Sequence, residues 1–543
     1  MNKITKILLI SLFIVGTLFS WGPAGASGRL LRGTWAWPTY IDPAVGSDFS
    51  SSIALIHLYD PLIYPDREMN PQPHVAKSWE VSADGKTWTF YLRPGIKFHN
   101  GSELTAQDVK FSMDRLTTIG EGYAFLFTER VTNTEASDKY TVVFHLKEPF
   151  APFLGALYRF FIVNKELVMA NIKKPGPYGE MGNYGKQYLL THDAGSGPYM
   201  VKKFAFEEYL LMTKNQNYWQ PEYAQVNPFA PDEVKMYGTT EPITVRTMMA
   251  RRELEFSDAW QSEEAFEALD KIKGVDITQY STGNEWYLML HTRKAPTDCI
   301  HFRKAIAWAL DYKTLTKFFP DCPQARGPVP QTLPGADPTL LQYHRDLNKA
   351  MTELKQSKYY GQLEKYSVEF HWNGDVPVTE KVALLFMSNM ADIGINVKIV
   401  KTPWLSIVEE SARMDTSPNI AIINDAPIYP EAGSLLESRY KSDSAPTWEQ
   451  NEWLLDPEYD TMVDDALKTI DQEERFAKYS KIQHYIMDLC PSIFMVELLM
   501  KHAYQATYID GPAFRGEATP FMGYDLDSRF IKVYPEKQAE LLK

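Results

Sequence analysis

In the first half of the chain, hydrophobic and polar residues alternate over short stretches, which is the pattern of a strand with one buried face. Residues 87–92 and 141–146 alternate in this way, and Asp84-Gly85 before the first stretch marks a hairpin turn. Residues 30–37 read as another short strand that ends in the turn at Asp42-Pro43. The pattern predicts three strands in these places.

Helical spacing of apolar residues is clearer in the second half. In the first half, Thr105 and Asp108 form a capping-box pattern, which predicts the start of a helix. In the second half, the helix predicted by Val382, Phe386 and Met390 is followed by a strand at 396–400. Helix followed by strand predicts an α/β fold. The three later stripes are Phe302, Ile306 and Leu310, then Val382, Phe386 and Met390, and finally Phe476, Tyr479 and Ile486.

The Pro/Gly-rich stretch 327–335 reads as a long surface loop rather than a linker, and the chain shows no internal repeat and no low-complexity segment. Of the residues, 44% are hydrophobic and 13% are aromatic, which is enough to fill large cores. A chain of this length exceeds what one core usually serves, so two or three lobes are expected.

The N-terminus has the build of a secretory signal peptide. Lys3 and Lys6 precede an apolar stretch at 7–19, which is shorter than the roughly 20 residues that span a bilayer. The small residues at 24–26 supply a cleavage point after Ala26, and no cysteine near it offers a lipid attachment atom. We therefore expect residues 1–26 to be removed and the mature protein to be free in the periplasm; a membrane anchor is the alternative.

The charge changes the expected class of partner. The formal net charge is −13, and removing the two lysines of the leader makes it −15. An acidic surface without a Lys/Arg-rich run argues against nucleic acid. The chain has no nucleophile elbow, zinc-protease motif, P-loop or dinucleotide fingerprint, so we expect no enzyme and no cofactor.

Three cysteines would enter an oxidising compartment. Cys299 and Cys322 bracket one predicted helix and are a candidate disulfide, while Cys490 is expected to be a small buried residue. Without a Cys-x-x-Cys pair, zinc and thiol-redox sites have no support.

A resemblance to a known family emerges at residues 76–101, AKSWEVSADGKTWTFYLRPGIKFHNG, continued by TAQDV at 105–109. This block closely resembles the family 5 extracellular solute-binding proteins, the dipeptide, oligopeptide and nickel type of ABC transporter. Supporting segments extend the resemblance from about residue 30 to beyond residue 500. They are GSGPY at 195–199, NYW at 217–219, FRKAI at 302–306, IGINV at 393–397 and RFAKY at 475–479.

The resemblance implies a two-lobed α/β periplasmic-binding-protein fold of the large cluster-C type, with an extra subdomain in the first lobe and the ligand between the lobes. It divides the chain into the core of lobe I, the additional subdomain of lobe I, and lobe II. The expected boundaries are 27–58 with 188–288 and 498–543 for the core, 59–187 for the subdomain, and 289–497 for lobe II.

The function that the resemblance implies is the periplasmic substrate-binding component of an ABC importer. The protein would capture a peptide or similar small solute by lobe closure, as a monomer, and deliver it to the permease subunits, which work with cytoplasmic ATPases. The alternatives are a receptor of the same fold for an oligosaccharide, opine or metal chelate, and a sensory binder without a dedicated transporter.

In peptide-binding relatives an aspartate after a strand of lobe II pairs with the peptide's ammonium group, and Asp425 matches that position. A carboxylate in a closed cleft needs a cation, although a helix cap or turn is the alternative role. Dipeptide-specific relatives use an arginine at the place where this chain has Asn373, so a strict dipeptide specificity is disfavoured.

Three further residues complete the predicted ligand-binding set near the cleft. Trp286 and Trp372 could stack on a ligand, with core packing as the alternative, and Asn284, two residues before Trp286, is the third candidate.

Overall fold

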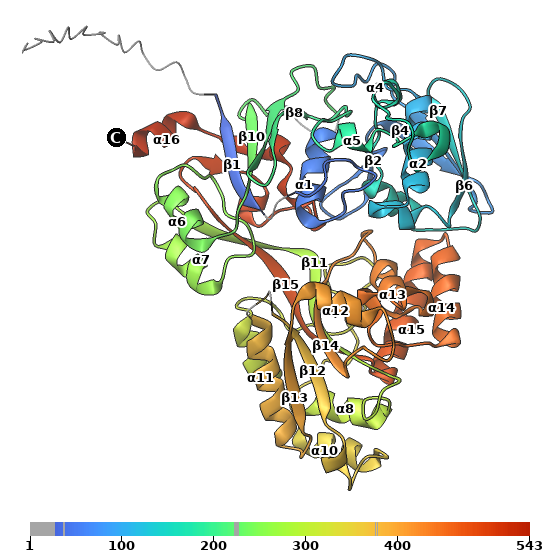
Figure 1. The fold of residues 1–543 in the computed structure, drawn as a ribbon, viewed down its shortest axis with the longest axis vertical. Helices are drawn as coiled ribbons and strands as arrows, with labels where there is room; N and C mark the ends of the chain where they lie inside the picture. The colour runs from blue at the N-terminus through green and yellow to red at the C-terminus, as the bar shows by residue number, and fades with distance from the viewer. Residues whose placement is uncertain (1–27, 36–37, 222–226, 375, 377, 543) are drawn as a thin grey trace, which may run out of the picture.

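The structure is a computed structural model that describes residues 28–35, 38–221, 227–374, 376 and 378–542. The predicted signal peptide, residues 1–26, lies outside the described residues. The chain forms a broad upper part and a tapering lower part (Figure 1). We call the upper part, residues 28–288 and 498–542, lobe I, and the lower part, residues 289–497, lobe II.

The core of lobe I is a four-stranded sheet in the order β1-β10-β9-β8. Strand β1 (Leu30–Trp35) is parallel to β10 (Glu233–Gly238), whereas β9 (Tyr209–Lys214) is antiparallel to both β10 and β8 (Tyr199–Ala205). One face of β9 is buried, as its alternating pattern requires. The helices of this part are α1 (Phe49–Leu58), α6 (Pro242–Ala250), α7 (Glu263–Asp270) and α16 (Pro535–Leu541).

The additional subdomain of lobe I has an antiparallel sheet in the order β4-β5-β7-β6, covered by α2 (Ala106–Ile119). Thr105 and Asp108 form the predicted capping box: the Thr105 backbone N–H donates to Asp108 Oδ2 at 2.9 Å. The strands are β4 (Ala76–Val81), β5 (Thr87–Leu92), β6 (Val131–Ala136) and β7 (Thr141–Leu146), and the smaller elements are β2 (Ile63–Pro65), β3 (Pro71–Pro73), α3 (Phe153–Ala156), α4 (Lys165–Ala170) and α5 (Lys186–Leu189).

Aromatic rings fill the core of this subdomain. Phe144 lies edge-on to Phe90 and to Phe153, each with ring centroids 5.6 Å apart, and Trp88 packs on Phe153 at the same separation. Burying one such side chain stabilises the fold by roughly 1.5–3 kcal/mol. The diagnostic block of the sequence is therefore structural: its aromatic residues build a core, and Gly85 takes the positive φ of 68° that its turn requires.

Lobe II is built on a five-stranded sheet in the order β13-β12-β14-β11-β15. Strand β12 (Val368–Asn373) is parallel to β13 (Val397–Thr402) and β14 (Ile420–Asp425), and helices α11 (Val378–Ala391) and α12 (Trp404–Ser411) make the crossovers. The other helices are α8 (Ile300–Ala309), α9 (Tyr312–Leu315), α10 (Leu347–Gln356), α13 (Ala432–Tyr440), α14 (Pro457–Lys468) and α15 (Gln472–Leu489).

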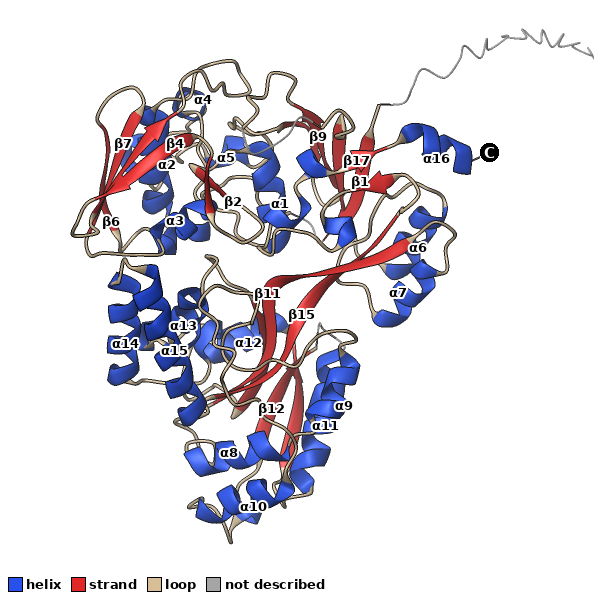
Figure 2. Ribbon diagram, turned by 180° about the vertical axis from the view of Figure 1, so that it is seen from behind, coloured by secondary structure: helices blue, strands red, loops and turns tan. Residues whose placement is uncertain are grey.

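Two long strands join the lobes. Strand β11 (Asp276–Leu290) and strand β15 (Ser492–Tyr504) pair antiparallel and run from the lobe I side into the lobe II sheet (Figures 1 and 2). Their register shifts between Ser281 and Asn284, close to the boundary between the lobes. The last short strands, β16 (Ile509–Asp510) and β17 (Lys532–Val533), pair in lobe I.

The two-lobed α/β fold is confirmed, and so are the predicted strands at 87–92 and 141–146 and the helices that carry the apolar stripes. The exact lobe boundaries stay a prediction.

The expectation of a surface loop at 327–335 is wrong. Val329 and Leu333 are buried in the core, and the Pro328 carbonyl accepts a hydrogen bond from Arg439 Nη1 at 3.2 Å. The Gln331 N–H donates to Glu497 Oε2 at 3.1 Å. Proline and glycine mark where a chain can turn, but not what covers the turn; here, side chains of lobe II satisfy the buried backbone.

Candidate functional site: a cavity between the lobes

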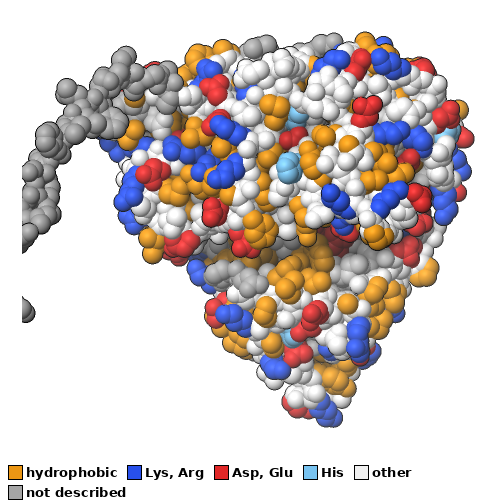
Figure 3. Space-filling model, turned by 45° about the horizontal axis from the view of Figure 1, so that its top comes forward, with side chains coloured by type: hydrophobic (Ala, Val, Ile, Leu, Met, Phe, Trp, Pro, Cys, Tyr) orange, Lys and Arg blue, Asp and Glu red, His pale blue; other side chains and the backbone are white. Residues whose placement is uncertain are grey.

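A cavity of about 410 Å³ lies at the boundary between the lobes. The space-filling view shows the surface hollowed along this boundary, with hydrophobic side chains beside it (Figure 3). This volume lies within the usual range of small-molecule sites. Lobe I lines it with Ser47, Phe49, Tyr123, Phe125, Trp260, Asn284, Met500 and Met522, and lobe II with Asn424, Asp425, Ala426, Ile428, Trp448 and Glu449.

Aromatic side chains dominate the lobe I wall. Trp260 is 49% exposed and Phe125 53%, which is unusual for such large apolar groups. Phe49 packs edge-on against Trp260 with ring centroids 6.2 Å apart. On the lobe II wall, Trp448 is held edge-on by Trp404 at 5.3 Å. The cavity therefore offers rigid aromatic faces on both sides of the space where a solute would lie.

Asp425 ends strand β14 and lines the cavity, but its carboxylate already has protein partners. Oδ2 accepts a hydrogen bond from Arg439 Nε at 3.0 Å, and Oδ1 accepts from the Ala426 N–H at 2.7 Å. Arg439 is fully buried on α13 and lies over the Tyr287 ring at 4.2 Å. Asp425 is thus the acceptor of a buried ion pair within the protein.

Arg439 is shared with a second carboxylate. Its Nη1 donates to Glu285 Oε2 at 2.5 Å, and both residues are fully buried. Burial raises the pKa of Glu285 to about 8, although Arg439 opposes the shift. One guanidinium therefore serves two carboxyl groups, and no second cation pairs with either of them among the described ion pairs.

Glu449 is the other acid that lines the cavity, on the single turn Trp448–Gln450, which we label η7. Among the described residues, no hydrogen bond or ion pair reaches its carboxylate; only its backbone N–H is bonded, to Thr447 Oγ1 at 3.2 Å. Loss of water on burial, followed by repulsion from Asp425, raises the pKa of Glu449 to about 8, against the opposing effect of Arg439. A ligand cation near this group would face no competing protein cation in direct contact.

The predicted ligand-binding residues divide into two groups. Asp425 and Asn284 line the cavity, and Asn284 Nδ2 donates to Thr282 Oγ1 at 2.9 Å. Trp286 and Trp372 do not line it: both are buried in the core of lobe II, Trp286 against Phe319. The two rings therefore pack in the core, which was the alternative to stacking on a ligand, because both strand positions face the helices that cover the sheet.

Asn373 also lies away from the cavity lining, at the end of β12. Its carbonyl oxygen accepts a hydrogen bond from Thr379 Oγ1 at 2.8 Å, at the start of α11. The structure therefore gives Asn373 a place in a strand-to-helix turn.

Sequence reasoning missed most of the cavity. Trp260 and Phe125 lie outside regular strands, and Glu449 lies in a single helical turn, so no periodic pattern distinguishes them from other loop residues. Their exposure is a signal that exists only once the chain is folded.

The candidate disulfide between Cys299 and Cys322 is not present: both are free thiols, as is the buried Cys490. Cys322 Sγ accepts a hydrogen bond from the Leu499 N–H at 3.4 Å, so the sulfur faces strand β15. Bracketing a helix in sequence does not by itself bring two sulfurs together.

Contacts across the boundary bring the lobes together beside the cavity. Arg130 of the additional subdomain pairs with Glu437 of α13, and Arg159 Nε donates to the Ile428 carbonyl at 3.2 Å. The Ala151 N–H donates to the Leu467 carbonyl at 2.8 Å. These contacts describe a closed arrangement on the side of helices α13 and α14.

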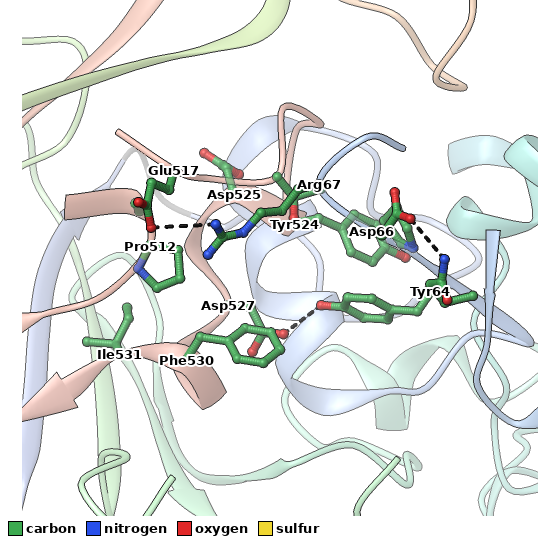
Figure 4. Close-up of a pocket in the computed structure, with 14 residues that line it drawn as sticks. Tyr64, Asp66, Arg67, Pro512, Glu517, Tyr524, Asp525, Asp527, Phe530 and Ile531 are labelled. Carbon is green, nitrogen blue, oxygen red and sulfur yellow. Dashed lines mark hydrogen bonds and ion pairs between the residues drawn. The ribbon is translucent and has the colours of Figure 1, made fainter. Parts of the chain in front are cut away.

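A second cavity, of about 390 Å³, lies entirely within lobe I (Figure 4). Arg67 reaches Glu517 at 3.5 Å, and Tyr64 donates its hydroxyl to Asp527 Oδ2 at 2.6 Å. Asp527 also pairs with Arg529 at 2.6 Å. We call this site the lobe I pocket; its charged groups are largely paired with one another.

No helix in the described ranges is long and apolar enough to cross a membrane. The same part of the chain holds no group of three or more His, Cys, Asp or Glu side chains arranged to bind a metal ion.

Two lobes joined by a pair of crossing strands, with a cavity lined from both, define the class of two-lobed solute-binding proteins. The chain belongs to family 5 of the bacterial extracellular solute-binding proteins: the family model with the description "Bacterial extracellular solute-binding proteins, family 5 Middle" matches residues 70–446. The resemblance found in the sequence is confirmed.

Relatives of known name agree with this assignment. The chain is 28% identical over 478 residues to the "Probable D,D-dipeptide-binding periplasmic protein DdpA" of Escherichia coli (strain K12), covering 86% of this chain and 88% of that protein. It is 24% identical over 478 residues to the glutathione-binding protein GsiB of Shigella boydii serotype 4 (strain Sb227), covering 86% and 89%. Both relatives are named as binding proteins and not as enzymes.

Solved structures share the fold. The periplasmic binding protein DppA of Helicobacter pylori, in complex with the peptide STSA, superposes with a TM-score of 0.75 at 22% identity and covers 93% of this chain and 98% of its own. The substrate-binding protein CtaP of Listeria monocytogenes gives a TM-score of 0.80 at 19% identity, with 93% and 99% covered.

Proposed function

We propose that this protein is the periplasmic substrate-binding component of an ABC importer, which captures a peptide or similar small solute between its lobes. The observation that carries the proposal is the interlobe cavity, because it takes its lining from both lobes. A solute in such a cavity contacts lobe I and lobe II together only when they are closed, so binding favours closure.

The remaining parts of the proposal follow from this role. After removal of residues 1–26 the protein would act as a monomer in the periplasm, without a cofactor and without catalysis. The closed shape would be recognised by the permease subunits, which deliver the solute with the help of cytoplasmic ATPases. The names of the D,D-dipeptide and glutathione relatives favour a peptide-like solute.

A strict preference for ordinary dipeptides is not part of the proposal. Asn373 stands where dipeptide-specific relatives carry an arginine, and it cannot form the bidentate pair that a guanidinium makes with a carboxylate.

The test is to purify the protein from its native periplasm without unfolding and to identify the bound solute by mass spectrometry. Calorimetry with D-alanyl-D-alanine and glutathione then measures affinity. Recovery of a peptide-like solute that rebinds supports the proposal. Recovery of an oligosaccharide, an opine or a metal chelate, with no binding of either peptide, contradicts the peptide part, and turnover of a bound amide would contradict the non-enzymatic part.

A further inference from the structure

The interlobe cavity contains two acids, and they differ in what surrounds them. Both oxygens of Asp425 accept hydrogen bonds within the protein, one of them from the buried guanidinium of Arg439. A ligand cation at Asp425 would therefore compete with Arg439, which also donates a hydrogen bond to Glu285. The family position for an ammonium is thus already occupied by an arginine of this chain.

Glu449 has the opposite surroundings. It lines the same cavity, and no protein donor reaches its carboxylate within the described residues. The charged groups around it are Asp425 on β14 and Glu437 and Arg439 on α13. Glu437 is paired with Arg130 and Arg439 with Asp425 and Glu285, so the nearby cations are engaged elsewhere.

The neighbouring walls suit an organic cation. Trp448 precedes Glu449 on the same turn, and Trp260 and Tyr123 line the cavity from lobe I. Aromatic faces attract ammonium groups, and a half-buried carboxylate supplies the opposite charge. The acid and the aromatic lining therefore both favour an organic ammonium as the ligand.

We propose that Glu449, rather than Asp425, is the carboxylate that binds a ligand cation in the interlobe cavity, and that the preferred solutes carry a free ammonium group. This inference rests on the proposed function, because it names the class of solute for the same site. The sequence position matched to the ammonium in relatives then serves as a structural acceptor for Arg439.

The proposal has a consequence for protons. Without ligand, the raised pKa keeps much of the Glu449 population protonated near pH 7. An arriving ammonium favours the carboxylate, so the carboxyl proton passes to the buffer while the ammonium keeps its own. Binding of a cationic solute is therefore accompanied by proton release from Glu449.

Isothermal titration calorimetry at pH 6.5 tests the inference with three probes: D-alanyl-D-alanine, glutathione and 2-phenylethylammonium chloride. The N-acetyl form of each probe removes the cation. Wild type is expected to bind at least one free amine about 30-fold or more tightly than its N-acetyl form, and Glu449→Gln is expected to lose that preference. Glu536→Gln, at an exposed position of α16, is the matched control.

Two buffers with different ionisation enthalpies measure the protons released on binding. Wild type should release protons and Glu449→Gln should not. A thermal melt of each variant shows whether it is folded.

The outcomes separate the two proposals. Glu449-dependent binding of 2-phenylethylammonium without binding of either peptide would support the cation site and contradict the peptide function. Peptide binding that is insensitive to Glu449→Gln or to N-acetylation would overturn the inference and leave the proposed function in place. The inference would also be overturned if Asp425→Asn lost the preference for the free amine while Glu449→Gln kept it. Failure of all three amines to bind wild type would overturn it as well.

Discussion

The interlobe cavity and the lobe I pocket have almost the same volume, about 410 and 390 Å³, yet they are built differently. Lobe I alone forms the second pocket, and its charges are paired internally: Asp527 with Arg529 and Tyr64, and Arg67 with Glu517 (Figure 4). Asp525 there accepts a hydrogen bond from Tyr280 at 3.0 Å.

The interlobe cavity draws on both lobes, and no side chain in the described part of the chain pairs with the Glu449 carboxyl group. Cavity size therefore says little about which site binds a solute. Two other features indicate the solute site. It is lined by both lobes, and the described residues give the Glu449 carboxyl group there no partner, so a bound solute can stabilise both the closed lobes and the ionised acid.

The largest expected effect on the free energy of unfolding comes from substituting the buried arginine of each region, Arg439 and Arg529. Arg439→Met leaves Asp425 and Glu285 without their shared cation and should lower the free energy of unfolding by about 3–5 kcal/mol. Arg529→Met removes the partner of Asp527 and should also destabilise the protein. Urea unfolding measures both losses.

Only the Arg439 variant should also alter solute affinity, because Arg439 supports the interlobe cavity and Arg529 supports the lobe I pocket. An equal loss of affinity in the two variants would break the comparison.

The pH range over which a buried acid lowers the free energy of unfolding should differ between the two regions. Glu452 is fully buried beside the Arg439 cluster, and burial raises its pKa to about 8, whereas burial raises the pKa of Asp525 to about 6. A carboxyl group whose folded pKa is raised keeps its proton in the folded state after the unfolded state has lost it. Its contribution to the free energy of unfolding therefore weakens as the pH rises, by up to about 1.4 kcal/mol per pH unit.

Glu452→Gln should remove this loss between about pH 4.5 and 8, and Asp525→Asn between about pH 4 and 6. Urea midpoints measured from pH 4 to pH 9 test both windows. A wild-type stability that rises steadily from pH 5 to 8 and is unchanged in shape by Glu452→Gln would contradict the assignment.

A smaller effect is expected from the exposed aromatic residues. Trp260→Ala should change the free energy of unfolding by less than about 1 kcal/mol, because half of its surface is exposed, but should weaken solute binding about tenfold. Phe530→Ala, in the lobe I pocket, should leave solute affinity unchanged. Calorimetry with the solute recovered from the native protein provides the measurement, and equal effects of the two substitutions would remove Trp260 from the site.

The smallest effect should come from the interlobe ion pair. Arg130→Gln removes the contact with Glu437 and one of the interactions that hold the lobes closed. A partly exposed pair contributes about 0.5–1 kcal/mol, so affinity should fall only a few-fold. Small-angle scattering should show a larger radius of gyration for the ligand-free variant. An unchanged radius and affinity would show that closure depends on the other contacts, such as that of Arg159.

Local rules were sufficient for much of the fold. The capping box at Thr105 and Asp108 and the alternation at 87–92 and 141–146 depend on neighbours in sequence, and the structure confirms each. The loop at 327–335 was misjudged because its burial depends on Arg439 and Glu497, more than a hundred residues away. The unpaired cysteines show the same limit.

The site was less predictable than the fold. Asp425 lines the cavity, but its partner Arg439 gives it an internal role that the strand pattern does not reveal. Trp286 and Trp372 were chosen as candidate stacking residues, while Trp260 and Trp448 actually line the cavity.

The sequence by itself determined the family and the α/β class, because these depend on a continuous block of residues and on local periodicity. Only the tertiary structure decided which acids meet in the interlobe cavity and which cation neutralises them. The reason is that the free energy of a buried charge depends on every neighbour within a few ångströms, and Glu449, Asp425 and Arg439 become neighbours only when lobe II folds.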